Sequence, residues 1–222
     1  MTAFKKIAAT AAKRHGGEAS LKKLMPKPAN AKALKAMSDD RYLSRMSFRV
    51  FATGLKHSMV EGKWPAFEEV FHGFEPRRVR AMSDEDLEGL LKDARIIRHL
   101  GKIRATHANA AAMCEIADEH GSFSAWLADW PGDDIVGLWE TIQKRFSHMG
   151  GISGPYFLRM VGKDTFIFSK DVVKALNDWG ILEGEPKSKK ARAAMQEAFN
   201  TWAAETGRPL SELSRILALS VD

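Results

Sequence analysis

Apolar residues recur along this chain at the spacing of an α-helix, and the alternation typical of a β-strand is almost absent. In the stretch SDDRYLSRMSFRVFATGLKHSMV, the cap-type residues Ser38 and Asp39 come before a periodic apolar face. That face consists of Tyr42, Met46, Val50, Phe51 and Leu55. Gly62 and Pro65 are expected to interrupt this helical pattern. In SDEDLEGLLKDA, Ser83 stands three residues before Asp86, a capping-box pattern that predicts another helix start.

The same periodicity predicts further helices with short connections between them. These segments cover residues 66–74, 101–121, 123–130, 133–149, 155–162, 171–180, 187–207 and 209–221. Only TFIF, residues 165–168, is strand-like, and it is too short to start a sheet. The pattern therefore predicts an all-α protein of roughly ten helices.

The positive charge of the chain is concentrated near the N-terminus. The 222 residues, 45% of them hydrophobic, suffice for one sizeable domain or two small lobes that share a core. A net charge of +6 favours nucleic acid or an anionic surface as partner. Residues 1–35 carry nine lysines and arginines against one acid, Glu18. We therefore expect residues 1–37 to form a flexible basic arm, either solvated or following a phosphate backbone, and residues 38–222 to form the helical domain.

The cysteine content and the lack of long apolar runs bear on the compartment. Cys114 is the only cysteine, so no disulfide forms within the chain and no cysteine cluster can hold zinc or iron–sulfur. No apolar run approaches the roughly 20 residues that span a bilayer. The basic N-terminus lacks the apolar core of a secretory signal. A cytoplasmic location is expected.

A glycine cluster separates two predicted helices in the stretch MGGISGPYFLRMVGKDTFIFSKDVVKAL, residues 149–176. Its members are Gly150, Gly151, Ile152, Ser153 and Gly154. Glycine permits positive φ, and the free N–H groups at a helix start can bind phosphate. Lys163 and Lys170 would add charge nearby. The alternative is a tight turn with no ligand.

Three segments resemble known DNA-repair proteins. The glycine turn resembles the helix–hairpin–helix element of the DNA glycosylase superfamily. DARIIRHLGKIRATHANA (93–110) and ATGLKHSMVEGKWPAFEEVFHGFEPRRVRAM (52–82) are similar to segments of the DNA-3-methyladenine glycosylase I family. The resemblance is specific over residues 50–113, weaker over 150–176 and absent over 1–37. It implies a glycosylase-like helical globule with two lobes around a cleft.

The resemblance also implies an activity and a set of site residues. The activity is hydrolysis of the N-glycosidic bond of an alkylated purine such as 3-methyladenine in double-stranded DNA, by a monomer that needs no cofactor or metal. Lys170 is the only contender for a catalytic lysine, so a monofunctional enzyme is expected. The expected base pocket comprises Arg49, Phe51, His57, Trp64 and Tyr156. The expected DNA contacts are the glycine turn with Lys102, Lys163 and Lys170.

Asp171 is the best-placed catalytic acid, although it could equally be a helix-start residue that satisfies free N–H groups. An alternative alignment puts Ser169 in the place of the catalytic aspartate.

Three positions depart from the family. Asp171 stands where a zinc-ligating histidine is expected and no cysteine follows, so no zinc clamp is predicted. Arg49 replaces the glutamate that reads the base, and a guanidinium only donates hydrogen bonds. His57 replaces the tryptophan that stacks on the base.

Two other functions stay open. One is a non-catalytic DNA-binding protein that kept the scaffold, and the other is a helical protein–protein adaptor that uses residues 188–219.

Overall fold

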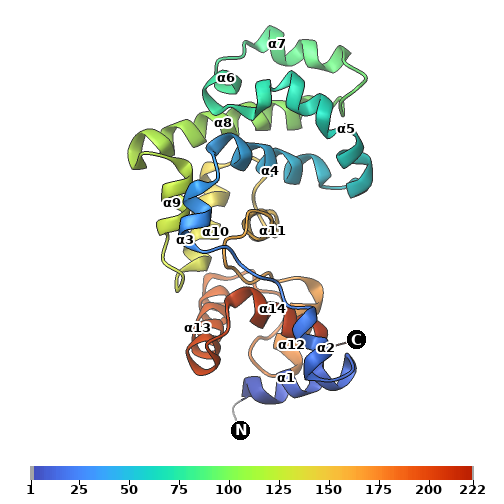
Figure 1. Ribbon diagram of the computed structural model, residues 1–222, viewed down its shortest axis with the longest axis vertical. Helices are drawn as coiled ribbons and strands as arrows, with labels where there is room; N and C mark the ends of the chain where they lie inside the picture. The colour runs from blue at the N-terminus through green and yellow to red at the C-terminus, as the bar shows by residue number, and fades with distance from the viewer. Residues whose placement is uncertain (1–2, 222) are drawn as a thin grey trace. The chain divides into compact units, whose positions relative to one another are not determined.

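Helices account for the regular secondary structure of residues 3–221, the part of the chain that the computed structural model describes (Figure 1). The elements are α1 (Ala3–Arg14), α2 (Glu18–Lys23), α3 (Ala31–Ala36), α4 (Asp39–Ala52), α5 (His57–Val70), η1 (His72–Phe74), α6 (Pro76–Arg80), α7 (Asp84–Gly89), η2 (Leu90–Lys92), α8 (Leu100–His120), α9 (Phe123–Asp129), α10 (Ile135–Arg145), α11 (Ser153–Met160), α12 (Lys170–Asp178), α13 (Lys189–Thr206) and α14 (Leu210–Leu219). The all-α prediction is confirmed, and residues 165–168 form no strand. No helix in this part of the chain has the length and apolar character to cross a membrane.

The chain divides into two compact units, each assembled from separate stretches of sequence. The terminal unit comprises the described residues up to Ala29, then Pro131–Leu138, then those from Gly162 onward. The central unit comprises Asn30–Trp130 and Trp139–Val161.

The basic N-terminal segment is folded into helices rather than extended, and these helices are shared between the two units. Phe4, Ile7 and Ala11 lie on one face of α1 and are buried. This face packs against α14, and the ring of Phe4 also lies 5.2 Å from that of Trp202 on α13. Helix α3 packs against α9 in the central unit. The division between the two units falls after Ala29, whereas the sequence predicts a boundary after residue 37.

The core of the central unit is built around α8. This helix packs along α4, α6 and α9, and its buried alanines allow close approach. An aromatic cluster from α4, α5, η1 and the residue between α5 and η1 adds to this core. Its members, Phe51, Phe67, Phe71 and Phe74, are fully buried. Each such side chain contributes roughly 1.5–3 kcal/mol relative to an exposed one.

Helix α5 runs unbroken from His57 to Val70, so the expected interruption at Gly62 and Pro65 is wrong. Proline has no N–H to donate to the carbonyl four residues earlier, which here belongs to Glu61. Pro65 and Glu61 are both exposed, so water can satisfy that carbonyl. The unbroken helix places residues 57, 61, 64 and 68 on one face.

Candidate functional site

A buried asparagine of α8 forms two hydrogen bonds to the start of the hairpin between α10 and α11. Nδ2 of Asn109 donates to the carbonyl oxygen of Ser147 at 3.2 Å, and the amide of Ser147 donates to Oδ1 of Asn109 at 2.7 Å. Asn109 is fully buried. The chain then turns through positive φ at His148 and at Gly151, both at 60°. This reciprocal pair fixes where the turn begins.

The turn leaves backbone donors unused. The amide of Ser153 donates to the carbonyl of Gly150 at 3.2 Å, and no side chain caps α11. Within the described chain, the amides of Gly151, Ile152 and Gly154 have no hydrogen-bond partner. Gly150 and Gly151 are exposed, and Ile152 is half-buried. Unpaired amides at the start of a helix form a site suited to an anion such as phosphate.

The other two residues of the turn serve packing instead. Ser153 and Gly154 are buried. A Cβ on Gly154 would lie 3.2 Å from the carbonyl oxygen of Met149 and 3.5 Å from Cγ2 of Ile142. The glycine therefore allows α11 to approach α10 closely, and only the first three turn residues reach the surface.

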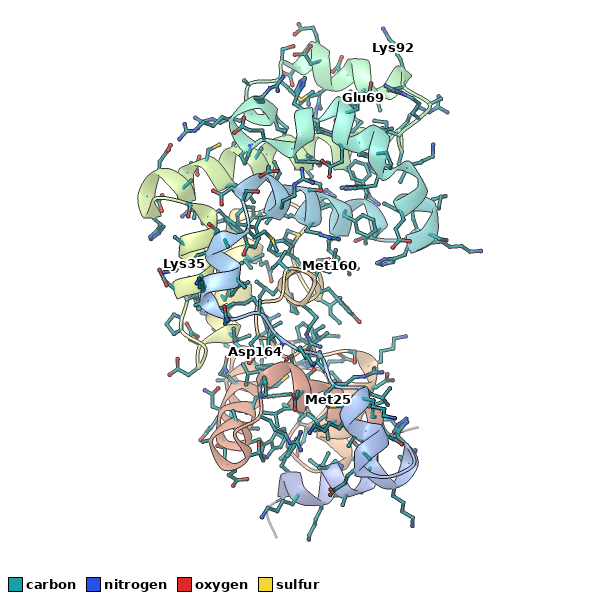
Figure 2. The ribbon with its side chains drawn as sticks, viewed as in Figure 1. Met25, Lys35, Glu69, Lys92, Met160 and Asp164 are labelled. Atoms are coloured by element: carbon teal, nitrogen blue, oxygen red, sulfur yellow. The ribbon has the colours of Figure 1, made fainter. Side chains whose placement is uncertain are left out.

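A cavity of about 520 Å³ lies in the central unit, within the size range of small-ligand sites. Its lining comes from α4, α5 and α11 with the residue Met37 before α4, and comprises Met37, Arg41, Ser44, Arg45, Phe48, His57, Glu61, Trp64, Glu68 and Met160. Met160 is labelled in Figure 2. The ring of Phe48 lies 5.6 Å from that of His57 and 5.0 Å from that of Trp64. Of the expected base-pocket residues, His57 and Trp64 are thus brought together.

Several side chains that line this cavity form a hydrogen-bonded network. Nη1 and Nη2 of Arg41 donate to the two carboxylate oxygens of Glu68, each at 2.9 Å. The hydroxyl of Ser44 donates to Oε1 of Glu68 at 2.7 Å and accepts from Nε1 of Trp64 at 3.1 Å. Burial alone would raise the pKa of Glu68, but these hydrogen bonds and the Arg41 charge hold it below its ordinary value. The sequence interpretation missed Glu68, although its spacing from His57 and Trp64 on one helix face was available as a signal.

The other expected pocket residues lie outside the cavity lining. The guanidinium of Arg49 lies 4.8 Å from the centre of the Tyr156 ring, a cation–π contact between α4 and α11. Burial lowers the pKa of Arg49, and its Nε is buried without a partner in the described chain. Phe51 is fully buried with its ring 4.5 Å from that of Phe67, so a base cannot reach it in this structure.

The two expected catalytic residues lie at the start of α12 in the terminal unit. Oγ of Ser169 accepts from the amide of Val172 at 3.4 Å and so acts as the helix cap. Asp171 is exposed in the first turn, where its charge also favours the helix dipole. Lys170 beside it is exposed. Lys163 is buried with 6% of its surface exposed, which argues against a phosphate contact.

Lys102, the remaining expected DNA contact, is used within the fold. Its Nζ donates to the carbonyl oxygens of Phe51 at 3.1 Å and Thr53 at 2.8 Å. Phe51 lies in the last turn of α4 and Thr53 is the residue that follows the helix, where carbonyls lack partners within the helix. Burial lowers the pKa of Lys102. The ammonium therefore stabilises the end of α4.

Among residues 3–221, no three or more His, Cys, Asp or Glu side chains gather in a group that could hold a metal ion.

Comparison with known proteins places the chain in a family. The family model for methyladenine glycosylase matches residues 33–149, more than half of the sequence. The chain therefore belongs to the methyladenine glycosylase family. DNA-3-methyladenine glycosylase 1 of Escherichia coli (strain K12) is 44% identical over 63 residues, which are 28% of this chain and 34% of that relative. The chain thus spans about a third of the length of this curated relative.

Solved structures share the fold at low sequence identity. The 3-methyladenine DNA glycosylase I of Staphylococcus aureus matches with a TM-score of 0.52 and 22% identity, over 63% of this chain and 81% of that one. The 8-oxoguanine glycosylase/lyase of Methanocaldococcus jannaschii, crystallised with a 15mer DNA that contains 8-oxoguanine, matches with a TM-score of 0.54 and 14% identity. That match covers 96% of this chain and 95% of the other. The fold is therefore that of helical DNA glycosylases, and the second match extends it to nearly the whole chain.

We expect Asn109→Ala to destabilise the protein by roughly 2–3 kcal/mol, because it leaves the partly buried N–H and carbonyl of Ser147 unpaired. The urea midpoint of unfolding measures this loss. Asn200→Ala is the control, since Asn200 also makes two hydrogen bonds, donating to the carbonyl of Asp133 and accepting from Gln196, but is only half-buried. Equal and small effects of the two variants would mean that the Asn109 pair does not hold the hairpin.

We expect Lys102→Met to lower the free energy of unfolding by about 1–2 kcal/mol, since it removes two hydrogen bonds from a charged donor. The salt dependence of duplex binding should not change. Lys92→Met, at an exposed position, is the control and should change neither quantity. A salt slope that falls by about one unit in Lys102→Met would instead indicate a phosphate contact.

Proposed function

We propose that this protein is a monofunctional DNA glycosylase that hydrolyses the N-glycosidic bond of an alkylated purine, such as 3-methyladenine, in double-stranded DNA. The relatives' names specify 3-methyladenine, and one fold relative was crystallised with DNA. A cytoplasmic monomer without cofactor is part of the proposal.

The family match carries the proposal, because residues 33–149 include both helices that line most of the cavity and the asparagine that pins the hairpin. The free amides of Gly151 and Ile152 would bind a backbone phosphate. The cavity, with Phe48, His57 and Trp64 in its walls, would receive a base taken out of the helical stack.

Release of an alkylated purine requires little catalytic assistance from the site. An alkylated purine carries positive charge, so its bond to the sugar is already weakened and the base leaves as a neutral molecule. Positive charge then develops on the sugar, and a carboxylate stabilises it until water adds to the anomeric carbon and releases one proton to the solvent. Asp171 is the proposed carboxylate. Its exposure leaves its oxygens accessible, whereas Ser169 is engaged as the helix cap.

One observation favours a second function. Arg49 stands where the family has a base-reading glutamate, and it is held over Tyr156 rather than in the cavity lining. A protein that kept the scaffold and lost base release would bind DNA without cleaving the glycosidic bond.

An excision assay distinguishes these functions. Duplexes that contain 3-methyladenine, 7-methylguanine or hypoxanthine are incubated with the full chain, and the released base is measured by chromatography. We expect release of at least the methylated purines, together with DNA binding that weakens steeply with salt. Tight binding without release across the panel would establish the non-catalytic function, and no salt-dependent binding at all would favour a protein adaptor.

Asp171→Asn tests the catalytic assignment. We expect excision to slow by about 100-fold or more, with duplex binding unchanged, because the substitution removes the charge that stabilises the sugar cation. Ser169→Ala is the matched control. It should lower the free energy of unfolding by about 1 kcal/mol through loss of the cap while leaving the single-turnover rate nearly intact. An unchanged excision rate in Asp171→Asn would mean that Asp171 is not catalytic and only stabilises the start of α12.

A further inference from the structure

Helix α5 presents a stripe of functional side chains to the cavity. His57, Glu61, Trp64 and Glu68 are spaced four, three and four residues apart, and all four line it. Of the two carboxylates, Glu61 is exposed, whereas the side chain of Glu68 is only 27% exposed. The stripe therefore combines an aromatic wall with one partly buried carboxylate.

The carboxylate of Glu68 is held rigidly but is not saturated. Oε1 accepts two hydrogen bonds, from Arg41 and from Ser44. In the described part of the chain, Oε2 accepts one, from Arg41. Each carboxylate oxygen has two lone pairs, so Oε2 keeps one position for a further donor.

The neighbouring arginine has little donor capacity left for a ligand. Besides its two hydrogen bonds to Glu68, Arg41 donates from Nε to Asp40 at 2.7 Å and from Nη2 to the carbonyl of Gly73 at 2.6 Å. Four of its five N–H groups are therefore engaged. At this end of the cavity, a ligand would therefore mainly find a hydrogen-bond acceptor, Oε2 of Glu68.

Trp64, whose ring lines the cavity, is linked to the same carboxylate by hydrogen bonds. Nε1 of Trp64 donates to the hydroxyl of Ser44, which in turn donates to Glu68. The ring of Trp64 also stacks on Phe74, at 5.3 Å and 7° between planes. A ring that entered the cavity would therefore meet an indole and an acceptor whose relative positions are fixed.

We propose that Glu68 reads the N–H edge of the base in this cavity, and so supplies from α5 the acceptor that Arg49 cannot supply from α4. This rests on the proposed function. The site should favour a methylated purine with an exocyclic amine over a 6-oxopurine, because a carbonyl oxygen at the same place would face the lone pairs of Oε2. The surrounding charged groups, Arg45 and Glu61, are exposed and offset each other.

Binding of free bases tests the assignment without requiring catalysis. The full chain is titrated with 3-methyladenine and with hypoxanthine, and the indole N–H signal of Trp64 is followed by NMR. We expect 3-methyladenine to shift this signal and to bind more tightly than hypoxanthine. Glu68→Gln should weaken 3-methyladenine binding by about tenfold or more, the usual effect of losing a hydrogen bond to a charged group.

Glu69→Gln is the matched control. Glu69, labelled in Figure 2, is the next residue on α5, pairs with Arg95 at 2.8 Å and has a side chain 66% exposed. This variant should bind 3-methyladenine as the wild type does. If Glu68→Gln does not fold, Glu68→Asp keeps the charge, retracts it from the cavity and should also weaken binding.

The outcomes separate this inference from the proposed function. Wild-type affinity in the folded Glu68 variants, or no shift of the Trp64 signal in the wild type, would overturn the role of Glu68. Glu68-dependent binding of 3-methyladenine together with no excision from DNA would support this role and refute the proposed catalytic activity.

Discussion

The reciprocal hydrogen bonds between Asn109 and Ser147 are the constraint on which the proposed DNA contact depends. They satisfy the backbone of Ser147 from a fully buried side chain and so fix the start of the hairpin on α8. Because the turn is held there, it can leave the amides of Gly151 and Ile152 unpaired at the beginning of α11. In a loosely held turn these amides would not keep one direction, and the turn would offer no fixed anion site.

Helix α4 joins the two parts of the central unit that concern function. Phe51 on this helix packs in the aromatic core, whereas Phe48, one turn earlier, lines the cavity. Lys102 of α8 binds the carbonyls at the end of α4 and so couples its position to the helix that pins the hairpin. The core, the cavity and the hairpin therefore share α8 and α4 as a common support.

Local patterns predicted the helical class well, because helix periodicity and caps are encoded by neighbouring residues. Both bonds of the capping box at Ser83 and Asp86 are present. The sequence did not reveal that α5 continues through Pro65. A helix tolerates proline where the unpaired carbonyl of the preceding turn is exposed to water, and this exposure depends on the tertiary structure. The sequence also did not reveal Asn109 or Glu68, because their roles depend on partners 38 and 27 residues away. For Phe51 and Arg49, the resemblance indicated the helix but not the direction of the side chain.

The amide NMR spectrum of the hairpin in the presence of DNA shows whether its free amides bind phosphate. The full chain is titrated with a duplex that contains a stable analogue of the abasic site. We expect the amide protons of Gly151 and Ile152 to shift downfield and to become protected from solvent exchange, because they would donate hydrogen bonds to phosphate. Saturating DNA that leaves both amides unshifted and exchanging, while signals elsewhere move, would contradict this expectation.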